Sequence, residues 1–250
     1  MRFDNKVAFI TGGAVGFGRS FGVALAQEGA AVALADIDGD AARQTALQLQ
    51  ASGARALAVE CDVADETRVG SAVAATIEEL GGIDILINNA GRHLTKYNQP
   101  FSLLPRQDLR DLFDVNVFGV VNCSIACREA MRNRGGGAIV NIASIAGHLH
   151  VNPYSVSKLA VRGITVALAG EFAPDGIRVN AISPGLMATE NALTDLPEEM
   201  MKDFVENRQL VHRLGRMDDV VAAMLFLCSD DASFITGETI KVSGGYPAEL

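Results

Sequence analysis

A tyrosine and a lysine four residues apart, Tyr154 and Lys158, are the pair in this sequence best suited to chemistry. The hydropathy around them predicts a helix over 154–172, and residues four apart share a face of a helix. An isolated phenol has a pKa of about 10 and a nearby ammonium favours the phenolate, so we expect Lys158 to lower the pKa of Tyr154. Ser144 follows a predicted strand over 138–142, where its hydroxyl can donate a hydrogen bond to a carbonyl oxygen. Together these side chains are suited to proton transfer to or from an alcohol or carbonyl oxygen. The alternative is that Tyr154 only packs in the fold and Lys158 is solvated, and the spacing alone fits this alternative as well.

A glycine-rich segment, residues 11–18 with the sequence TGGAVGFG, lies between a predicted strand over 7–10 and a predicted helix over 18–28. Glycine lets the backbone turn tightly and approach a pyrophosphate, and the start of a helix offers free N–H groups. The spacing of Gly12, Gly16 and Gly18 is GxxxGxG instead of the commoner GxGxxG. Alone it fits an ordinary turn as well, but its position between strand and helix favours a dinucleotide site.

Asp36 ends the second predicted strand, 18 residues beyond Gly18. There a carboxylate can accept hydrogen bonds from the ribose hydroxyls of an adenosine. A 2′-phosphate would face this carboxylate, and neither Ile37 nor the loop residues Gly13 and Ala14 offer it a cation. The sequence therefore predicts NAD over NADP. The alternative is that Asp36 only caps a turn or helix in the segment that follows it.

Short apolar runs alternate along the chain with longer stretches of helical spacing. The runs are apolar throughout, as expected for strands covered by helices on both faces. Strands are predicted over 7–10, 31–35, 54–59, 83–87, 138–142, 177–181 and 239–242, and helices over 18–28, 40–51, 66–80, 106–132, 154–172, 197–208 and 219–228. This order predicts a single α/β domain over residues 1–250, a Rossmann-like, doubly wound parallel sheet of about seven strands flanked by helices on both faces.

Two irregular segments, 91–105 and 184–216, interrupt this alternation. Each follows a predicted strand, and ligands of such sheets bind outside the carboxyl ends of the strands, so we expect the substrate there. Apolar residues near this edge favour a hydrophobic or cyclic substrate; they are Leu94, Phe101, Leu103, Leu104, Leu149, Val151, Leu186 and Leu193.

The composition excludes several classes of protein. With 49% hydrophobic and 20% charged residues in 250, the chain is expected to fold around a core. A net charge of −9 without a basic run argues against nucleic acid, and no apolar run reaches the ~18–20 residues that span a bilayer, so no membrane partner is expected.

The cysteines and histidines predict a reduced compartment and no metal. The four cysteines form no CxxC pair and lie in apolar surroundings, and the N-terminus lacks the long apolar region of a signal peptide. A cytoplasmic protein with buried thiols fits best. The histidines, His93, His148, His150 and His212, lack the spacing of metal ligands.

Further motifs accompany these groups. Asp62-Val63 follows the third predicted strand, Asn88-Asn89-Ala90-Gly91 follows the fourth, residues 184–189 (PGLMAT) follow the sixth, and Asn116 lies within the long fourth helix. With residues 11–18 and the Tyr154–Lys158 pair, they stand in the order of the short-chain dehydrogenase/reductase family. The chain resembles a compact member of that family over nearly its whole length. The resemblance implies hydride transfer between a nicotinamide ring and a carbinol or carbonyl carbon.

The resemblance also implies roles for individual residues. In the catalytic set, Tyr154 moves the proton, Ser144 steadies the oxygen, Lys158 also holds the nicotinamide ribose, and Asn116 orders a water that links Lys158 to solvent. The implied cofactor-binding set is Gly12, Gly16, Phe17, Gly18, Asp36, Ile37, Asp62, Val63, Asn89, Ala90, Gly91, Tyr154, Lys158, Pro184, Gly185, Met187 and Thr189. Within it Asp62 and Val63 bind the adenine, while Met187 and Thr189 hold the nicotinamide carboxamide.

Three positions depart from the family pattern. Ser144 and Tyr154 are ten residues apart, fewer than is usual, so the connecting loop must be tight. Phe17 stands where a smaller aliphatic residue is usual, and Ser243 replaces an acid that often precedes the glycine pair near the C-terminus.

We expect an NAD-dependent oxidoreductase that acts on a secondary alcohol or its ketone. A 3-oxoacyl thioester reductase is an alternative that Asp36 disfavours, since such reductases usually use NADP. A non-catalytic nucleotide-sensing regulator is a second alternative, disfavoured by the Tyr154–Lys158 pair. Small residues on two helices permit close helix approach and, with the resemblance, favour a homo-oligomer, a tetramer before a dimer; they are Ala126, Ala130, Ala160, Gly163, Ala167 and Gly170.

Overall fold

Seven short apolar strands pair side by side into one sheet, in which every neighbouring pair is parallel. The computed structural model describes residues 1–149, 151–189 and 197–247. The strands are β1 (Val7–Thr11), β2 (Ala31–Asp36), β3 (Ala56–Glu60), β4 (Ile85–Asn88), β5 (Gly137–Ile142), β6 (Ile177–Pro184) and β7 (Thr239–Val242). Their order, β3-β2-β1-β4-β5-β6-β7, is that of a doubly wound, Rossmann-like sheet, as predicted.

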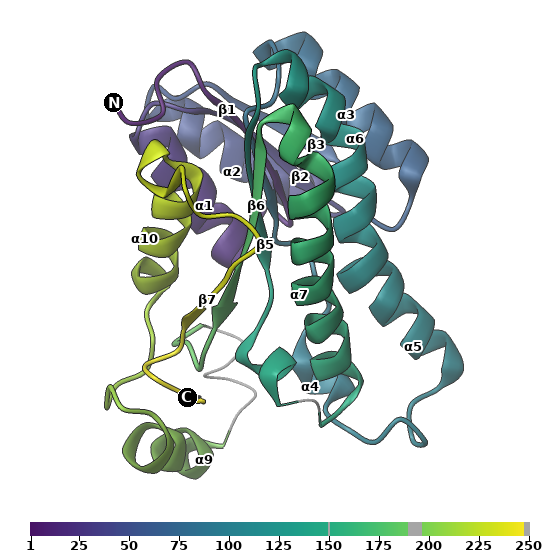
Figure 1. Ribbon diagram of the computed structural model, residues 1–250, viewed down its shortest axis with the longest axis vertical. Coiled ribbons are helices and arrows are strands. Elements are labelled where there is room, and N and C mark those ends of the chain that lie inside the picture. Colours follow the sequence, from purple (N-terminus) through teal and green to yellow (C-terminus); the bar gives the residue numbers. More distant parts are fainter. Residues whose placement is uncertain (150, 190–196, 248–250) are drawn as a thin grey trace.

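Helices cover both faces of this sheet (Figure 1). The helices on one face are α1 (Gly16–Gln27), α2 (Gly39–Ala51) and α10 (Met217–Cys228), and those on the other are α3 (Glu66–Leu80), α6 (Gly119–Asn133) and α7 (Pro153–Phe172). Helix α5 (Arg106–Phe113) precedes α6 and packs in a separate small cluster. Two short helices, α4 (Leu94–Tyr97) and α9 (Glu198–Asp203), both lie toward the lower end of the molecule in Figure 1.

Successive residues of β1 explain why the predicted strands are apolar throughout. Ala8 and Ile10 pack into the core cluster that contains Phe21 of α1, whereas Phe9 packs into the cluster on the opposite face, with Leu86 of β4. Side chains alternate between the faces of a strand, so a sheet with two covered faces needs apolar residues at every position.

Local signals set the ends of the helices. Asp65 precedes α3 and its side chain accepts hydrogen bonds from the backbone N–H groups of Thr67, at 2.9 Å, and Arg68, at 3.1 Å. Gly81 ends the same helix with a φ of +92°, a conformation that glycine adopts without strain.

The predicted helix over 106–132 is interrupted at one point. The α-helical hydrogen bonding of α5 gives way to a π-turn over Asp114–Phe118 before α6 begins. Asn116 lies in this turn and is 1% exposed. Such turns insert one extra residue into a helix and recur at functional sites.

A buried carboxylate ties three segments together at the amino end of the strands. Asp84 is 3% exposed and accepts hydrogen bonds from the backbone N–H of Val7, at 2.9 Å, and from Nη2 of Arg134, at 3.0 Å. Nζ of Lys6 lies 3.4 Å from the same carboxylate. The clamp joins the start of β1, the segment before β4 and the end of α6.

Candidate active site

The glycine loop lies where the order of the sheet reverses, since β2 pairs with one side of β1 and β4 with the other. The backbone of this loop packs against the end of β4. A Cβ atom built on Gly12, whose φ is +60°, would lie 2.9 Å from Nδ2 of Asn89, and one built on Gly18 would overlap the carbonyl oxygen of Gly12. Only glycine fits these positions. The residue before α1, Val15, gives the helix no side-chain cap. The loop therefore has the close-packed backbone and helix start that a pyrophosphate requires.

Thr11 and Asn89 join the glycine loop to the segment after β4. The side-chain nitrogen of Asn89 donates hydrogen bonds to the carbonyl oxygens of Thr11, at 3.0 Å, and Gly12, at 2.9 Å. The hydroxyl of Thr11 accepts from the backbone N–H groups of Asn89 and Ala90, each at 3.0 Å. Thr11 is 2% exposed and was not among the predicted site residues. Its position at the strand–loop junction is the signal that could have identified it.

The two carboxylates predicted to bind adenosine lie at the same edge of the sheet, and both also hold the backbone. Asp36 accepts hydrogen bonds from the N–H groups of Ala14, at 3.0 Å, and Asp38, at 3.1 Å. It thus supports the glycine loop besides being available to a ribose. Oδ1 of Asp62 accepts from the N–H of Ala64 at 3.0 Å. Asp36 therefore caps the turn that follows it, as the alternative interpretation expects, and it also lies at the edge of the sheet where the ribose was predicted to bind.

Flanking residues complete this part of the site. Ile37 is 64% exposed, beside Asp36, while Val63 is buried and its carbonyl accepts a hydrogen bond from Asn122 at 3.0 Å. Phe17 packs partly buried against the core and stacks on Phe21, with ring centroids 5.8 Å apart.

Ser144 and Tyr154 are hydrogen-bonded to each other, although the loop between them is short. A 3-10 turn over Ile145–His148 takes up much of its length, and Ser144 caps this turn by accepting a hydrogen bond from the N–H of Ala146 at 3.2 Å. Helix α7 then begins at Pro153, which makes Tyr154 its second residue. The structure brings the predicted serine and tyrosine together.

Lys158 is 5% exposed and lies one turn farther along α7. Its ammonium donates a hydrogen bond to the carbonyl oxygen of Ile142 at 2.8 Å, and Nζ lies 5.9 Å from the ring centroid of Tyr154. Burial disfavours the charged form, and it lowers the pKa of Lys158 from 10.5 to about 8.

The pKa of Tyr154 departs from the expected direction. Burial raises it above the ordinary value because the phenolate loses solvation, and the hydrogen bond from Ser144 opposes this rise. The prediction that Lys158 lowers the pKa of the phenol is wrong for this structure, since the group that does so is Ser144. The ammonium is instead directed to the carbonyl oxygen of Ile142, on the adjacent strand.

Asn116 connects the segment after β4 to helix α7. Its Oδ1 accepts a hydrogen bond from the N–H of Arg92 at 2.7 Å, and its Nδ2 donates to the hydroxyl of Ser157 at 3.1 Å. A Cβ atom built on Gly91 would lie 3.3 Å from Oδ1 of Asn116 and 3.4 Å from Nζ of Lys158. A side chain at position 91 would therefore crowd both Asn116 and Lys158. Ser157, the partner of Asn116, was not predicted.

The segment after β6 begins at the edge of the sheet where the glycine loop also lies. Pro184 is the last residue of β6, and the N–H of Gly185 donates to the carbonyl oxygen of Val242 at 2.9 Å. Met187 is 5% exposed and packs into a core cluster, so its side chain serves the fold. The N–H of Thr189 donates to the carbonyl oxygen of Met187 at 2.8 Å.

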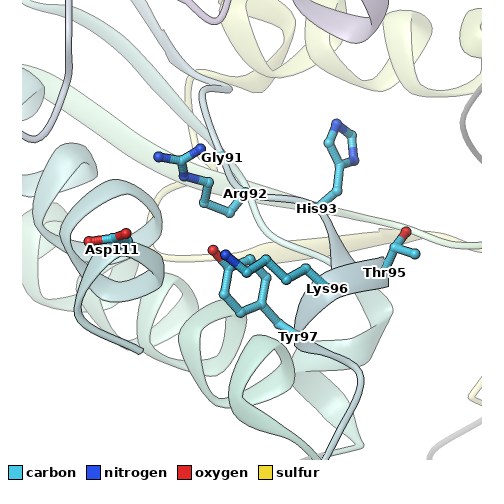
Figure 2. Close-up of a pocket in the computed structure, with 7 residues that line it drawn as sticks. All are labelled: Gly91, Arg92, His93, Thr95, Lys96, Tyr97 and Asp111. Atoms are coloured by element: carbon cyan, nitrogen blue, oxygen red, sulfur yellow. The ribbon is translucent and has the colours of Figure 1, made fainter. Parts of the chain in front are cut away.

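A pocket of about 460 Å³ adjoins Gly91, and most of the residues that line it have polar side chains (Figure 2). The lining residues are Gly91, Arg92, His93, Thr95, Lys96, Tyr97 and Asp111. Nζ of Lys96 lies 2.8 Å from a carboxylate oxygen of Asp108.

Of the apolar residues expected to face a substrate, Leu104 is instead core: it is 5% exposed and packs with Tyr97, Leu109 and Leu112. Leu193 and His150 lie outside the described residues. Phe101, Leu103 and Val151 are exposed.

In the described part of the chain, no three His, Cys, Asp or Glu side chains are grouped as metal ligands. His148 contacts the hydroxyl of Ser183 through Nε2 at 3.2 Å, and Nδ1 of His212 lies 2.8 Å from the carbonyl oxygen of Val205. None of the helices among the residues that the structure describes is long and apolar enough to cross a membrane.

The fold and site define an α/β protein in which a glycine loop and a Ser–Tyr–Lys group meet at one sheet edge. The family model described as enoyl-(acyl carrier protein) reductase matches residues 12–247. An uncharacterized oxidoreductase of Mycobacterium tuberculosis is 42% identical, over 97% of this chain and 98% of that protein. The 7alpha-hydroxysteroid dehydrogenase of Escherichia coli is 35% identical, over 100% of this chain and 97% of that protein.

A solved 7 alpha-hydroxysteroid dehydrogenase, complexed with NADH and 7-oxo glycochenodeoxycholic acid, superposes with a TM-score of 0.92 at 34% identity, covering 100% of this chain and 97% of that one. The chain belongs to the short-chain dehydrogenase/reductase family, and it is an oxidoreductase of that family.

Proposed function

We propose that the protein is an NAD-dependent dehydrogenase that interconverts a secondary alcohol and its ketone. The observation that carries this proposal is the hydrogen-bonded Ser144–Tyr154 pair beside buried Lys158, at the same sheet edge as the glycine loop. A bound nicotinamide supplies the hydride acceptor or donor. In alcohol oxidation, the phenolate of Tyr154 accepts the hydroxyl proton while Ser144 donates a hydrogen bond to the same oxygen.

The chain's own residues fit such a cofactor. The Gly12 and Gly18 positions admit no side chain, as close approach of a pyrophosphate requires. We propose that the dinucleotide is held by Gly12, Gly16, Phe17, Gly18, Asp36, Ile37, Asp62, Val63, Asn89, Ala90, Gly91, Tyr154, Lys158, Pro184, Gly185, Met187 and Thr189. Lys158 then donates to ribose hydroxyls, and Asn116 keeps Lys158 linked to solvent. Residues 1–250 act as a single domain in this proposal, in agreement with the one continuous sheet.

The preference for NAD over NADP rests on Asp36. Its carboxylate lies against the glycine loop and accepts a hydrogen bond of 3.0 Å from the N–H of Ala14, which fixes the position of the carboxylate. A 2′-phosphate at this place would meet a negative charge that the structure holds in position. The related dehydrogenase whose complex contains NADH agrees with this preference.

The substrate class is proposed to be a hydrophobic, cyclic secondary alcohol or ketone. The exposed apolar side chains of Phe101, Leu103 and Val151 belong to the segments around the site. The 7alpha-hydroxysteroid dehydrogenase of Escherichia coli, at 35% identity, is a relative whose name specifies such a compound.

We also propose that the protein is a cytoplasmic homo-oligomer, a tetramer before a dimer. Four apolar side chains are exposed along α6, α7 and the π-turn before α6: Phe118, Ile125, Leu159 and Val166. Gly163 and Gly170 have open space around the Cβ position, which lets another helix approach closely. Ala130, in contrast, is buried in the core and does not belong to this face. The four cysteines are free and buried, which suits a reducing compartment.

The test is steady-state turnover of a panel of alicyclic secondary alcohols and ketones, including 7-hydroxysteroids, with NAD and with NADP. The Tyr154→Phe variant should lose roughly 10²- to 10⁴-fold in turnover number, because it removes the acid–base group, while binding of NADH measured by fluorescence stays close to wild type. Turnover by this variant within a few-fold of wild type would refute the mechanism. Equal kcat/KM for NAD and NADP would refute the cofactor preference.

A further inference from the structure

The first turn of the catalytic helix α7 depends on one buried side chain. Asn152 is 6% exposed and precedes the helix, and its Oδ1 accepts hydrogen bonds from the N–H of Ser155, at 2.8 Å, and from the hydroxyl of Ser155, at 2.7 Å. The same hydroxyl accepts from the backbone N–H of Asn152 at 3.1 Å. Because Tyr154 lies inside this hydrogen-bonded turn, the orientation of the Asn152 side chain helps to set where the phenol points.

The other end of the same amide reaches a residue far away in sequence. Nδ2 of Asn152 donates a hydrogen bond to Oδ1 of Asn98 at 2.8 Å. Asn98 directly follows the short helix α4, in the segment that begins at Gly91. The assignment of oxygen and nitrogen is determined by chemistry: Oδ1 of Asn152 must face the N–H of Ser155, so its NH₂ group must face Asn98.

The residue before Asn98 strengthens this connection. Tyr97 is 3% exposed and forms a small core cluster with Leu104, Leu109 and Leu112, against which Tyr154 packs. Tyr97, which lines the pocket in Figure 2, therefore packs in the same cluster as Tyr154. The residue after it, Asn98, is hydrogen-bonded to Asn152, which caps the helix that carries Tyr154.

We propose that Asn98 is a positioning residue for Tyr154, acting through Asn152. By accepting one hydrogen bond, Asn98 fixes the amide of Asn152 in the orientation that caps α7, and this keeps the phenol of Tyr154 within hydrogen-bonding distance of Ser144. The inference rests on the proposed catalytic role of Tyr154. It makes the segment after β4 a part of the catalytic machinery as well as a wall of the pocket.

The experiment compares four variants that change which side-chain atoms donate and accept hydrogen bonds at positions 98 and 152. Asn98→Ala removes the acceptor and should lower the turnover number roughly 3- to 10-fold, the effect of one lost hydrogen bond. Asn98→Asp keeps an acceptor and should retain most activity. Asn152→Asp keeps the cap, and the Asn98 amide can turn its NH₂ group toward the new carboxylate, so it too should retain most activity. The double variant, Asn98→Asp with Asn152→Asp, sets two carboxylates against each other and should lose more turnover than the product of the single effects.

Further readouts separate positioning from a general loss of structure. Asn98→Ala should shift the pH profile of alcohol oxidation to higher pH, because the pKa of Tyr154 rises when the hydrogen bond from Ser144 weakens. Affinity for NADH should not change. Hydrogen exchange should increase in peptides that contain residues 152–158, which can be measured without any substrate.

The outcomes are distinct. Lower turnover in Asn98→Ala, recovery in Asn98→Asp and an excess loss in the double variant would support the inference. Unchanged exchange at the start of α7 in Asn98→Ala, or faster exchange with unchanged turnover and pH profile, would overturn it. Full activity of Tyr154→Phe would instead overturn the proposed function, whatever the exchange results.

Discussion

Replacing Lys158 with methionine should make the protein more stable at neutral pH. The wild-type chain must hold an ammonium in a site that is 5% exposed, with one hydrogen bond to the carbonyl oxygen of Ile142 at 2.8 Å. Burial lowers the pKa of Lys158 from 10.5 to about 8, and this difference corresponds to a cost of about 3 kcal/mol at pH 7. The Lys158→Met variant also loses the hydrogen bond to Ile142, which costs it about 1 kcal/mol of stability. We therefore expect the free energy of unfolding to rise by about 2 kcal/mol in this variant.

The sign of the pH dependence follows from the same shift. Between pH 8 and 10.5 the unfolded chain keeps the Lys158 proton while the folded chain has released it, so the stability contribution of this residue rises with pH. The advantage of Lys158→Met over wild type should therefore shrink by about 2 kcal/mol between pH 7 and pH 9.5.

Urea denaturation of wild type and variant at these two pH values tests the argument. Lys202→Met is the matched control, because Lys202 is 69% exposed and its removal should change the free energy of unfolding by less than about 0.5 kcal/mol at both pH values. A Lys158→Met variant that is less stable than wild type at pH 7, or whose advantage is the same at both pH values, would refute the reasoning. The variant should also be inactive, so stability and function oppose each other at this residue.

Three further predictions concern other parts of the molecule. Asp36→Asn keeps an acceptor for the glycine loop but removes the charge, so the ratio of kcat/KM for NAD to that for NADP should fall roughly tenfold, with little change in melting temperature; an unchanged ratio would contradict the role of the carboxylate. Asp84→Ala breaks the clamp among Val7, Arg134 and Lys6 and should lower the free energy of unfolding by about 2–4 kcal/mol, measured by urea titration, while kcat of the remaining folded enzyme stays close to wild type. The pKa of Cys61 is raised to about 11 and that of Cys228 to about 12 by burial, so iodoacetamide at pH 8 should leave both thiols unmodified in the folded protein; rapid labelling detected by mass spectrometry would argue against their burial.

The arrangement of strands and helices was predictable because both faces of the sheet are covered. β1 shows why: Ala8, Phe9 and Ile10 are all buried, so the run is apolar and stands out from the helical stretches around it. The structure extends the sixth strand to Pro184, beyond the predicted 181, since Ser183 and Pro184 pair with Lys241 and Val242 of the edge strand β7. Hydropathy does not register such polar and proline residues as strand.

The residue types of the site were predictable, but several of their interactions were not. Motif spacing identified Ser144, Tyr154 and Lys158, and the structure brings them together. The direction of the Tyr154 pKa depends on how completely the phenol is desolvated, which spacing along a helix does not report. The hydrogen bond between Asn98 and Asn152 joins positions 54 residues apart, and Leu104 becomes core through contacts with α5, so neither leaves a local periodic signal.

The extra residue in the π-turn over Asp114–Phe118 fixes the rotational phase of everything that follows it in α6. One residue corresponds to about 100° of rotation in an α-helix. Deleting a single residue there would restore unbroken helical geometry, yet it would turn Cys123, Cys127 and Met131, all now completely buried, away from the sheet. Insertions and deletions should therefore be rarer at this bend than in the surrounding loops of homologous proteins, even though the bend itself looks like an irregularity.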